Sequence, residues 1–177
     1  MDNRTDHSPT AVFVVASVIG IALTAVFATL WLGARGTEPG EVNRFLGLES
    51  SSAEATATDV ITAITTFDSD TIDTVRQQLL GLSTGDFRAD YEELLAGGLG
   101  DFVEESAVSS EGNIVEGPLI GFTSATRAMA VARVVQDVVS RDTPGGRTVF
   151  LVLRLGLTKQ GDAWKADSLK VLSQQTL

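Results

Sequence analysis

The stretch TVFLVLRLGLT, residues 148–158, alternates without a break between large aliphatic side chains and others. The aliphatic set consists of Val149, Leu151, Leu153, Leu155 and Leu157. The positions between them are mixed in polarity and include a charged residue, Arg154. A period of two is typical of a β-strand that buries one face and leaves the other in water. We therefore predict a central antiparallel strand with its leucine face covered.

Two further strands are expected directly beside this one. Residues 160–162 (QGD) form a turn signal that leads into a strand over residues 164–172. On the other side, residues 143–146 (TPGG) predict a turn, and residues 128–139 alternate again with small side chains on one face. Because both connections are short, we expect the three strands to run antiparallel.

An earlier strand is expected over residues 114–122, which brings the sheet to three or four strands. Gly117 and Pro118 interrupt this segment, and such a pair favours an edge position or a bulge. The sheet face opposite the leucines carries Arg133 and Asp137, which suits contact with solvent.

Three helices are expected before the strands. Apolar side chains recur at spacings of three and four in residues 53–67, 72–81 and 86–103, which predicts one buried face in each segment. The first segment is rich in threonine, a poor helix former, so packing must hold it. Residues 97–100 (GGLG) lie inside the third, and each glycine costs about 1 kcal/mol relative to alanine. We expect the third helix to bend or break there, or to have a close neighbour.

The order of these elements predicts the fold class. Helices that precede a meander of strands, rather than alternate with them, indicate an α+β domain. We expect about three helices on one face of a curved antiparallel sheet of three to four strands, over residues 53–177.

Residues 11–34 carry no charged side chain. A helix rises about 1.5 Å per residue, so this segment is longer than the roughly 30 Å hydrocarbon core of a bilayer. We predict a transmembrane helix, with a short tail at residues 1–10 and a tether at residues 35–52. A cleaved signal peptide and a buried core helix are the alternatives. A signal peptide would need a positively charged leader, but Asp2 and Asp6 outweigh Arg4 here, and the remaining domain is too small to enclose a core helix of this length.

One face of this predicted helix consists of small side chains at intervals of four. They are Ala16, Gly20, Thr24 and Ala28. Transmembrane helices approach each other closely on such faces, so we treat this one as a candidate contact in a homo-oligomer or with another protein. The arginines that flank the segment are nearly balanced, so charge does not indicate its orientation.

The net charge of −10 is unevenly distributed. Residues 45–116 hold fifteen acidic side chains against two arginines, whereas residues 117–177 have a balance of +4. An acidic chain repels phosphate backbones, so we expect no nucleic-acid partner. The chain has no cysteine, which excludes a disulfide framework and a thiolate metal site.

No constellation of side chains indicates a reaction. The one histidine, His7, precedes the apolar segment, so the domain lacks a histidine-based triad or metal site. Neighbouring carboxylates such as Glu92 and Glu93 point in different directions on a helix. The acidic residues of segment 68–73 lack the fuller ligand set of a calcium site. We predict no catalytic residue, no metal and no cofactor.

Short motifs along the chain resemble actinobacterial Mce-associated membrane proteins, which are single-span proteins often encoded beside Mce lipid-uptake systems. Residues 67–73 (FDSDTID) are similar to the aromatic-Asp-Tyr-x-Thr-Leu-Asp stretch of that family, with Ser69 in place of its second aromatic residue. Residues 85–87 (GDF) and Tyr91 resemble its Gly-x-Phe and following tyrosine. Residues 161–164 (GDAW) are similar to its final hairpin.

The resemblance implies a cell-membrane protein with a cytoplasmic N terminus and an extracytoplasmic domain of the cone-like nuclear transport factor 2 fold. It implies a non-catalytic accessory or scaffold subunit of an Mce-type lipid-import complex, in contact with the lipid bilayer and with protein partners. Two alternatives remain open. One is an assembly subunit of a type IV secretion or conjugation channel. The other is an apolar-ligand binder or isomerase that uses Tyr91, the only tyrosine.

Overall fold

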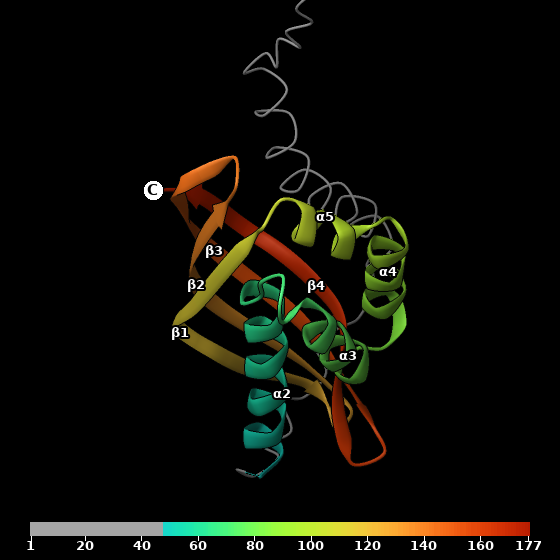
Figure 1. Ribbon diagram of the computed structural model, residues 1–177. Helices are drawn as coiled ribbons and strands as arrows, with labels where there is room; N and C mark the ends of the chain where they lie inside the picture. Colours follow the sequence, from blue (N-terminus) through green and yellow to red (C-terminus); the bar gives the residue numbers. More distant parts are fainter. Residues whose placement is uncertain (1–47) are drawn as a thin grey trace, which may run out of the picture. The chain divides into compact units, whose positions relative to one another are not determined.

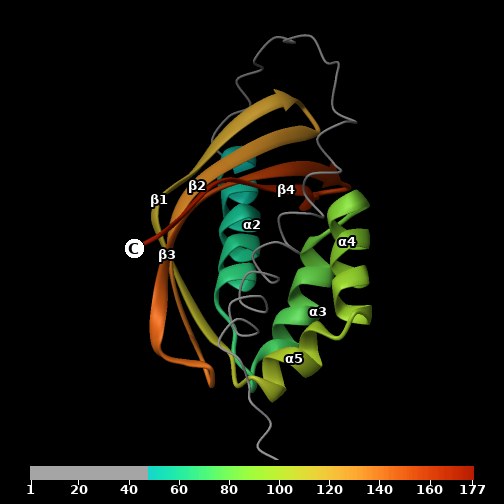
Figure 2. The same cartoon turned by 90° about the horizontal axis from the view of Figure 1, so that it is seen from above.

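The computed structural model describes residues 48–177, which form four helices followed by four strands (Figure 1). The elements are α2 (Leu48–Thr65), α3 (Ile72–Leu82), α4 (Gly85–Ala96), α5 (Leu99–Glu105), β1 (Ser109–Ser124), β2 (Arg127–Ser140), β3 (Thr143–Gln160) and β4 (Ala163–Thr176). The strands make one antiparallel sheet in the order β1-β2-β3-β4. Figure 2 shows all four helices on the same side of this curved sheet. The architecture is α+β and consistent with the nuclear transport factor 2 cone.

The helix-facing side of the sheet, hereafter the inner face, forms the main core. The five aliphatic residues of β3 that were predicted to be covered are buried, and Leu155 is fully enclosed. Buried alanines of β2 share this face, and their small size allows α2 to lie close against the sheet. Four residues of α2 have no exposed surface: Ala53, Ala57, Val60 and Ile61. Burial, rather than helix propensity, therefore holds the threonine-rich helix in place.

The C-terminal end of α2 is fixed to β1 by hydrogen bonds. Phe67 and Ser110 exchange two backbone hydrogen bonds of 3.0 and 2.8 Å, and the Ser110 hydroxyl donates to the Thr65 carbonyl at 2.7 Å. Gly112 lies under the same helix end, where an added Cβ would come within 2.1 Å of the Thr65 hydroxyl oxygen. The helix begins at Leu48, within the residues expected to form the tether.

The third predicted helix is divided, so the described chain has four helices rather than three. Helix α4 ends at Ala96 and α5 begins at Leu99. Gly98 between them has a φ of 89°, a left-handed conformation that glycine adopts without steric cost. The GGLG run is therefore a true break, and it lets α5 contribute to a second small core around Ile72 and Val103.

One hairpin differs from the prediction. The turn expected at residues 143–146 is wrong, because Ser140 already pairs with Thr143 and their hydroxyl oxygens lie 2.7 Å apart. The chain therefore turns at residues 141–142, and β3 begins earlier than its hydropathy suggests. The prediction of an edge strand or bulge at Gly117 and Pro118 is confirmed, since β1 is an edge strand with a register shift there.

Candidate functional site

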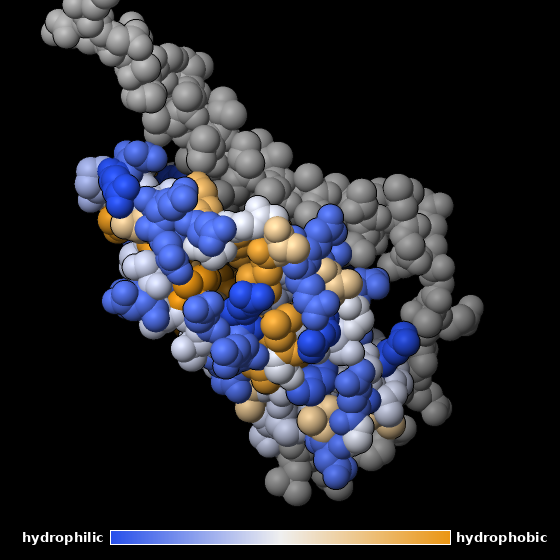
Figure 3. Space-filling model, turned by 45° about the vertical axis from the view of Figure 1, so that its right-hand side comes forward, coloured by the Kyte–Doolittle hydropathy of each residue, from blue (hydrophilic) through white to orange (hydrophobic). Residues whose placement is uncertain are grey.

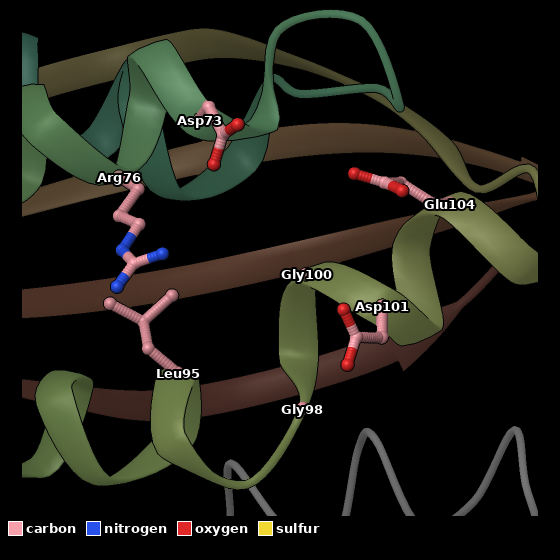
Figure 4. Close-up of a pocket in the computed structure, with 7 residues that line it drawn as sticks. All are labelled: Asp73, Arg76, Leu95, Gly98, Gly100, Asp101 and Glu104. Atoms are coloured by element: carbon pink, nitrogen blue, oxygen red, sulfur yellow. The ribbon is translucent and has the colours of Figure 1, made fainter.

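A polar hollow of about 250 Å3 lies between α3 and α5 (Figure 4). Its charged lining consists of Asp73, Arg76, Asp101 and Glu104, all of which are exposed. Arg76 makes no ion pair with any residue of segment 48–177. Because these charges are solvated, the hollow does not assemble an acid and base couple.

Tyr91, the candidate for an isomerase, lies on the buried side of α4. Only 7% of it is exposed, and burial raises its pKa while the positive charge of Arg76 partly opposes the shift. Asp90 is its neighbour in sequence, and consecutive helix residues point in different directions. Tyr91 is therefore part of the packing between α4 and the rest of the domain.

Asp90 itself is held in an unfavourable environment. Its Oδ2 atom is enclosed without a hydrogen-bond partner, and burial is the main reason that its pKa is raised. The negative charges of Asp86 and Glu93, one turn away on either side of it, raise the pKa further.

Figure 3, which views the domain from the side of α4, shows hydrophobic patches separated by many hydrophilic side chains.

The carboxylates of segment 68–73 serve the chain itself. Asp68 accepts hydrogen bonds from the Thr71 hydroxyl at 2.7 Å, the Thr71 amide at 2.8 Å and the Asp70 amide at 3.0 Å. The Thr71 hydroxyl is the main reason that the pKa of Asp68 is lowered. Within residues 48–177, no group of three or more acidic or histidine side chains is placed to hold a metal ion.

The predicted transmembrane segment, with its contact face of Ala16, Gly20, Thr24 and Ala28, lies outside the described residues. Within residues 48–177, no helix is both long and apolar enough to cross a membrane.

The side of the sheet that faces away from the helices, hereafter the outer face, is not covered by any described helix (Figure 2). Apolar side chains gather on it around the Arg133–Glu116 ion pair. The strand pairing brings together half-buried or exposed side chains from three strands: Leu119, Met129, Val131, Val135, Phe150 and Val152. Met129 and Leu119 are 37% and 65% exposed, although both are large hydrophobic residues. An exposed apolar surface of this kind, rimmed by polar residues, is typical of a protein contact.

Charges of opposite sign are offset diagonally on the outer face. Arg154 lies directly opposite Lys170 in the β3–β4 ladder and beside Val131 of β2. Glu111 lies directly opposite Asp137 in the β1–β2 ladder, at the end of the face near the β2–β3 turn, hereafter the acidic end. Like charges in opposed positions of a sheet are destabilising. Within residues 48–177 the one salt bridge on this face joins Arg133 to Glu116. Neither like-charge pair therefore has an ion-pair partner in this part of the chain.

The sequence predicted which β2 residues share this face but not which charges meet on it. The alternation in residues 128–139 placed Arg133 and Asp137 on the wet side correctly. The opposition of Arg154 and Lys170 depends on the register shift between Gly156 and Leu157 in the β3–β4 ladder, and a shift of one residue moves a side chain to the other face. No pattern within a single strand carries that information.

Comparison with known proteins gives a fold but no family. No protein-family model matches the chain, and no characterised protein matches its sequence. An IcmL-like type IV secretion system protein from Legionella pneumophila subsp. pneumophila str. Philadelphia 1 has a similar structure, with 18% identity and a TM-score of 0.53. The match covers 75% of this chain and 94% of that one.

The periplasmic domain of DotI is similar at 13% identity and a TM-score of 0.54, over 72% of this chain and 97% of that domain. A hexachlorocyclohexane dehydrochlorinase (LinA) Type2 is similar at 11% identity and a TM-score of 0.48, a likeness that carries no argument about chemistry. None of these three structures is an Mce-associated protein, so that resemblance rests on the short sequence motifs alone.

Proposed function

We propose that the chain is a non-catalytic assembly subunit of a type IV secretion-type channel, anchored by residues 11–34 with its α+β domain outside the cytoplasm. The observation that carries the proposal is the fold match to an IcmL-like secretion protein and to the periplasmic domain of DotI, over nearly the whole of each. The outer face supports it, because an uncovered apolar sheet surface suits a protein contact. The acidic and basic side chains of residues 48–177 also support a non-catalytic role, since they do not meet in a buried site.

Crosslinking the protein to its partners in cells tests this proposal. The full chain with an affinity tag is crosslinked in its native host, purified from membranes and analysed by mass spectrometry. We expect components of a secretion or conjugation channel among the crosslinked proteins. Deletion of the gene is expected to reduce transfer of protein or DNA and to leave lipid uptake unchanged. Loss of lipid uptake with normal transfer would instead support the lipid-import role.

The predicted transmembrane contact is tested separately. Gly20→Ile places a bulky side chain on the small-residue face, and we expect it to reduce the recovery of those partners. Ala22→Ile is the matched control, because residue 22 lies about half a turn away on the same predicted helix. Equal losses from both variants would show that the face has no special part in the contact.

A further inference from the structure

The outer face is nearly self-complementary, and its charge pattern is the first reason. The cationic pair Arg154 and Lys170 lies on β3 and β4, whereas the acidic pair Glu111 and Asp137 lies on β1 and β2. In the strand pairing the two pairs are offset diagonally: Arg154 lies beside Val131 of β2, whereas Glu111 lies beside Asp137 further along the same strand. A second copy, turned over onto the first about an axis between the sheets, therefore brings each cationic pair to an acidic pair.

Apolar side chains between the charged pairs are the second reason. Val135, Phe150 and Val152 lie about midway between the charged pairs in the pairing of β2 with β3, next to the Arg133–Glu116 ion pair. A two-fold axis through this point makes the apolar residues of one copy meet the same residues of the other. Such isologous contacts are the commonest in homo-oligomers, and apolar centres with charged rims are typical of them.

A surface hollow at the acidic end is the third reason. It has a volume of about 410 Å3 and is lined by Asp137, Val139 and Thr148, with Arg147 also on its border. Arg154 and Lys170 have long, cationic side chains, and they lie on β3 and β4 away from this hollow. The hollow therefore offers space beside a carboxylate for the cationic side chains of a second copy.

We propose that a second copy of this chain covers the outer face, in a two-fold contact that pairs Arg154 and Lys170 of each copy with Glu111 and Asp137 of the other. The contact relieves two like-charge oppositions in each copy. It also removes Val135, Phe150 and Val152 from water. The contact does not depend on the proposed channel role, so it stands or fails separately from the proposed function.

Single cysteines test the contact, because the chain has none of its own. The full chain carrying Val135→Cys, in detergent micelles under mild oxidation, is expected to form a disulfide-linked homodimer at low salt. Ala89→Cys, at an exposed position of α4 on the helical side, is the control and is expected to remain monomeric. Equal dimer yields from the two variants would overturn the proposal.

Charge reversal tests the pairing itself. In the Val135→Cys background, Arg154→Glu with Lys170→Glu sets acid against acid, and Glu111→Lys with Asp137→Lys sets base against base. We expect each double reversal to lower the dimer yield at least about tenfold, since like charges across an interface cost several kcal/mol. A mixture of the two variants restores every opposite pair, so it is expected to recover the dimer as a heterodimer.

The control for charge reversal is Arg76→Glu with Arg141→Glu, which makes the same change in net charge at exposed positions away from the outer face. This control is expected to keep the original dimer yield. Circular dichroism spectra that match the unmodified chain show that each variant is folded. Unchanged yield after reversal, or no recovery in the mixture of folded variants, would overturn the two-fold pairing.

Discussion

The two faces of one sheet differ in what their side chains do. On the inner face, Leu153 and Leu155 of β3 are 2% and 0% exposed beneath the helices. On the outer face, their sequence neighbours Val152 and Arg154 remain partly open to solvent. The alternation of a single strand thus separates two roles, because neighbouring side chains on a strand point to opposite sides. The inner face stabilises the fold, and the outer face is available for recognition.

The largest expected effect is the loss of a buried inner-face side chain. Leu155→Ala removes a fully enclosed side chain from the middle of the sheet, and we expect it to lower the free energy of unfolding by about 2–5 kcal/mol. Val152→Ala on the outer face is expected to cost about 1 kcal/mol or less. Urea denaturation of the full chain in micelles, followed by circular dichroism, measures both. Equal losses would remove the distinction between the faces.

The next effect concerns how closely a helix approaches the inner face. Gly112→Ala places a Cβ 2.1 Å from the Thr65 hydroxyl oxygen and 2.4 Å from its Cβ, so the end of α2 must shift. We expect a loss of about 1–3 kcal/mol in the free energy of unfolding. Gly121→Ala is the matched control on the same strand, because an added Cβ at Gly121 meets no atom within 4 Å. A variant at Gly112 as stable as this control would contradict the close packing.

The two faces were also unequally predictable from sequence. Burial of the inner face is encoded within single strands, so the alternation of β3 and of β2 predicted it residue by residue. The break at Gly98 was one of the outcomes that the GGLG run allowed, but the sequence alone did not choose among them. The pairing of Arg154 with Lys170 could not be predicted, because a bulge in the β3–β4 ladder sets that register.

A smaller effect is expected from the polar group buried at the inner face. Ser110 is 3% exposed, donates to the Thr65 carbonyl and accepts a 2.7 Å hydrogen bond from Gln136 Nε2. Ser110→Ala leaves both partners without this hydroxyl, and we expect it to cost about 1–2 kcal/mol. Ser109→Ala, its exposed neighbour on the other side of β1, is the control and is expected to change stability by less than about 0.5 kcal/mol. Similar values for the two serines would show that the hydroxyl network contributes nothing measurable.

The smallest effect lies on helix α4. Folding raises the pKa of Asp90, mainly through burial and then through Asp86 and Glu93, so the charged carboxylate opposes folding above that raised pKa. Asp90→Asn removes this charge and is expected to increase stability at pH 7. Because the side chain is partly exposed, solvent screening keeps the gain below about 1 kcal/mol.

The sign of the Asp90 effect gives its own test. As the pH falls through the raised pKa, the carboxyl group of the folded chain takes up its proton before that of the unfolded chain. The penalty then disappears, so the advantage of Asp90→Asn is expected to shrink as the pH is lowered. Asp59→Asn, at an exposed position of α2, is expected to show no such pH-dependent gain. A less stable Asp90→Asn variant at pH 7 would mean that the charged Oδ2 atom has a favourable partner in the folded chain.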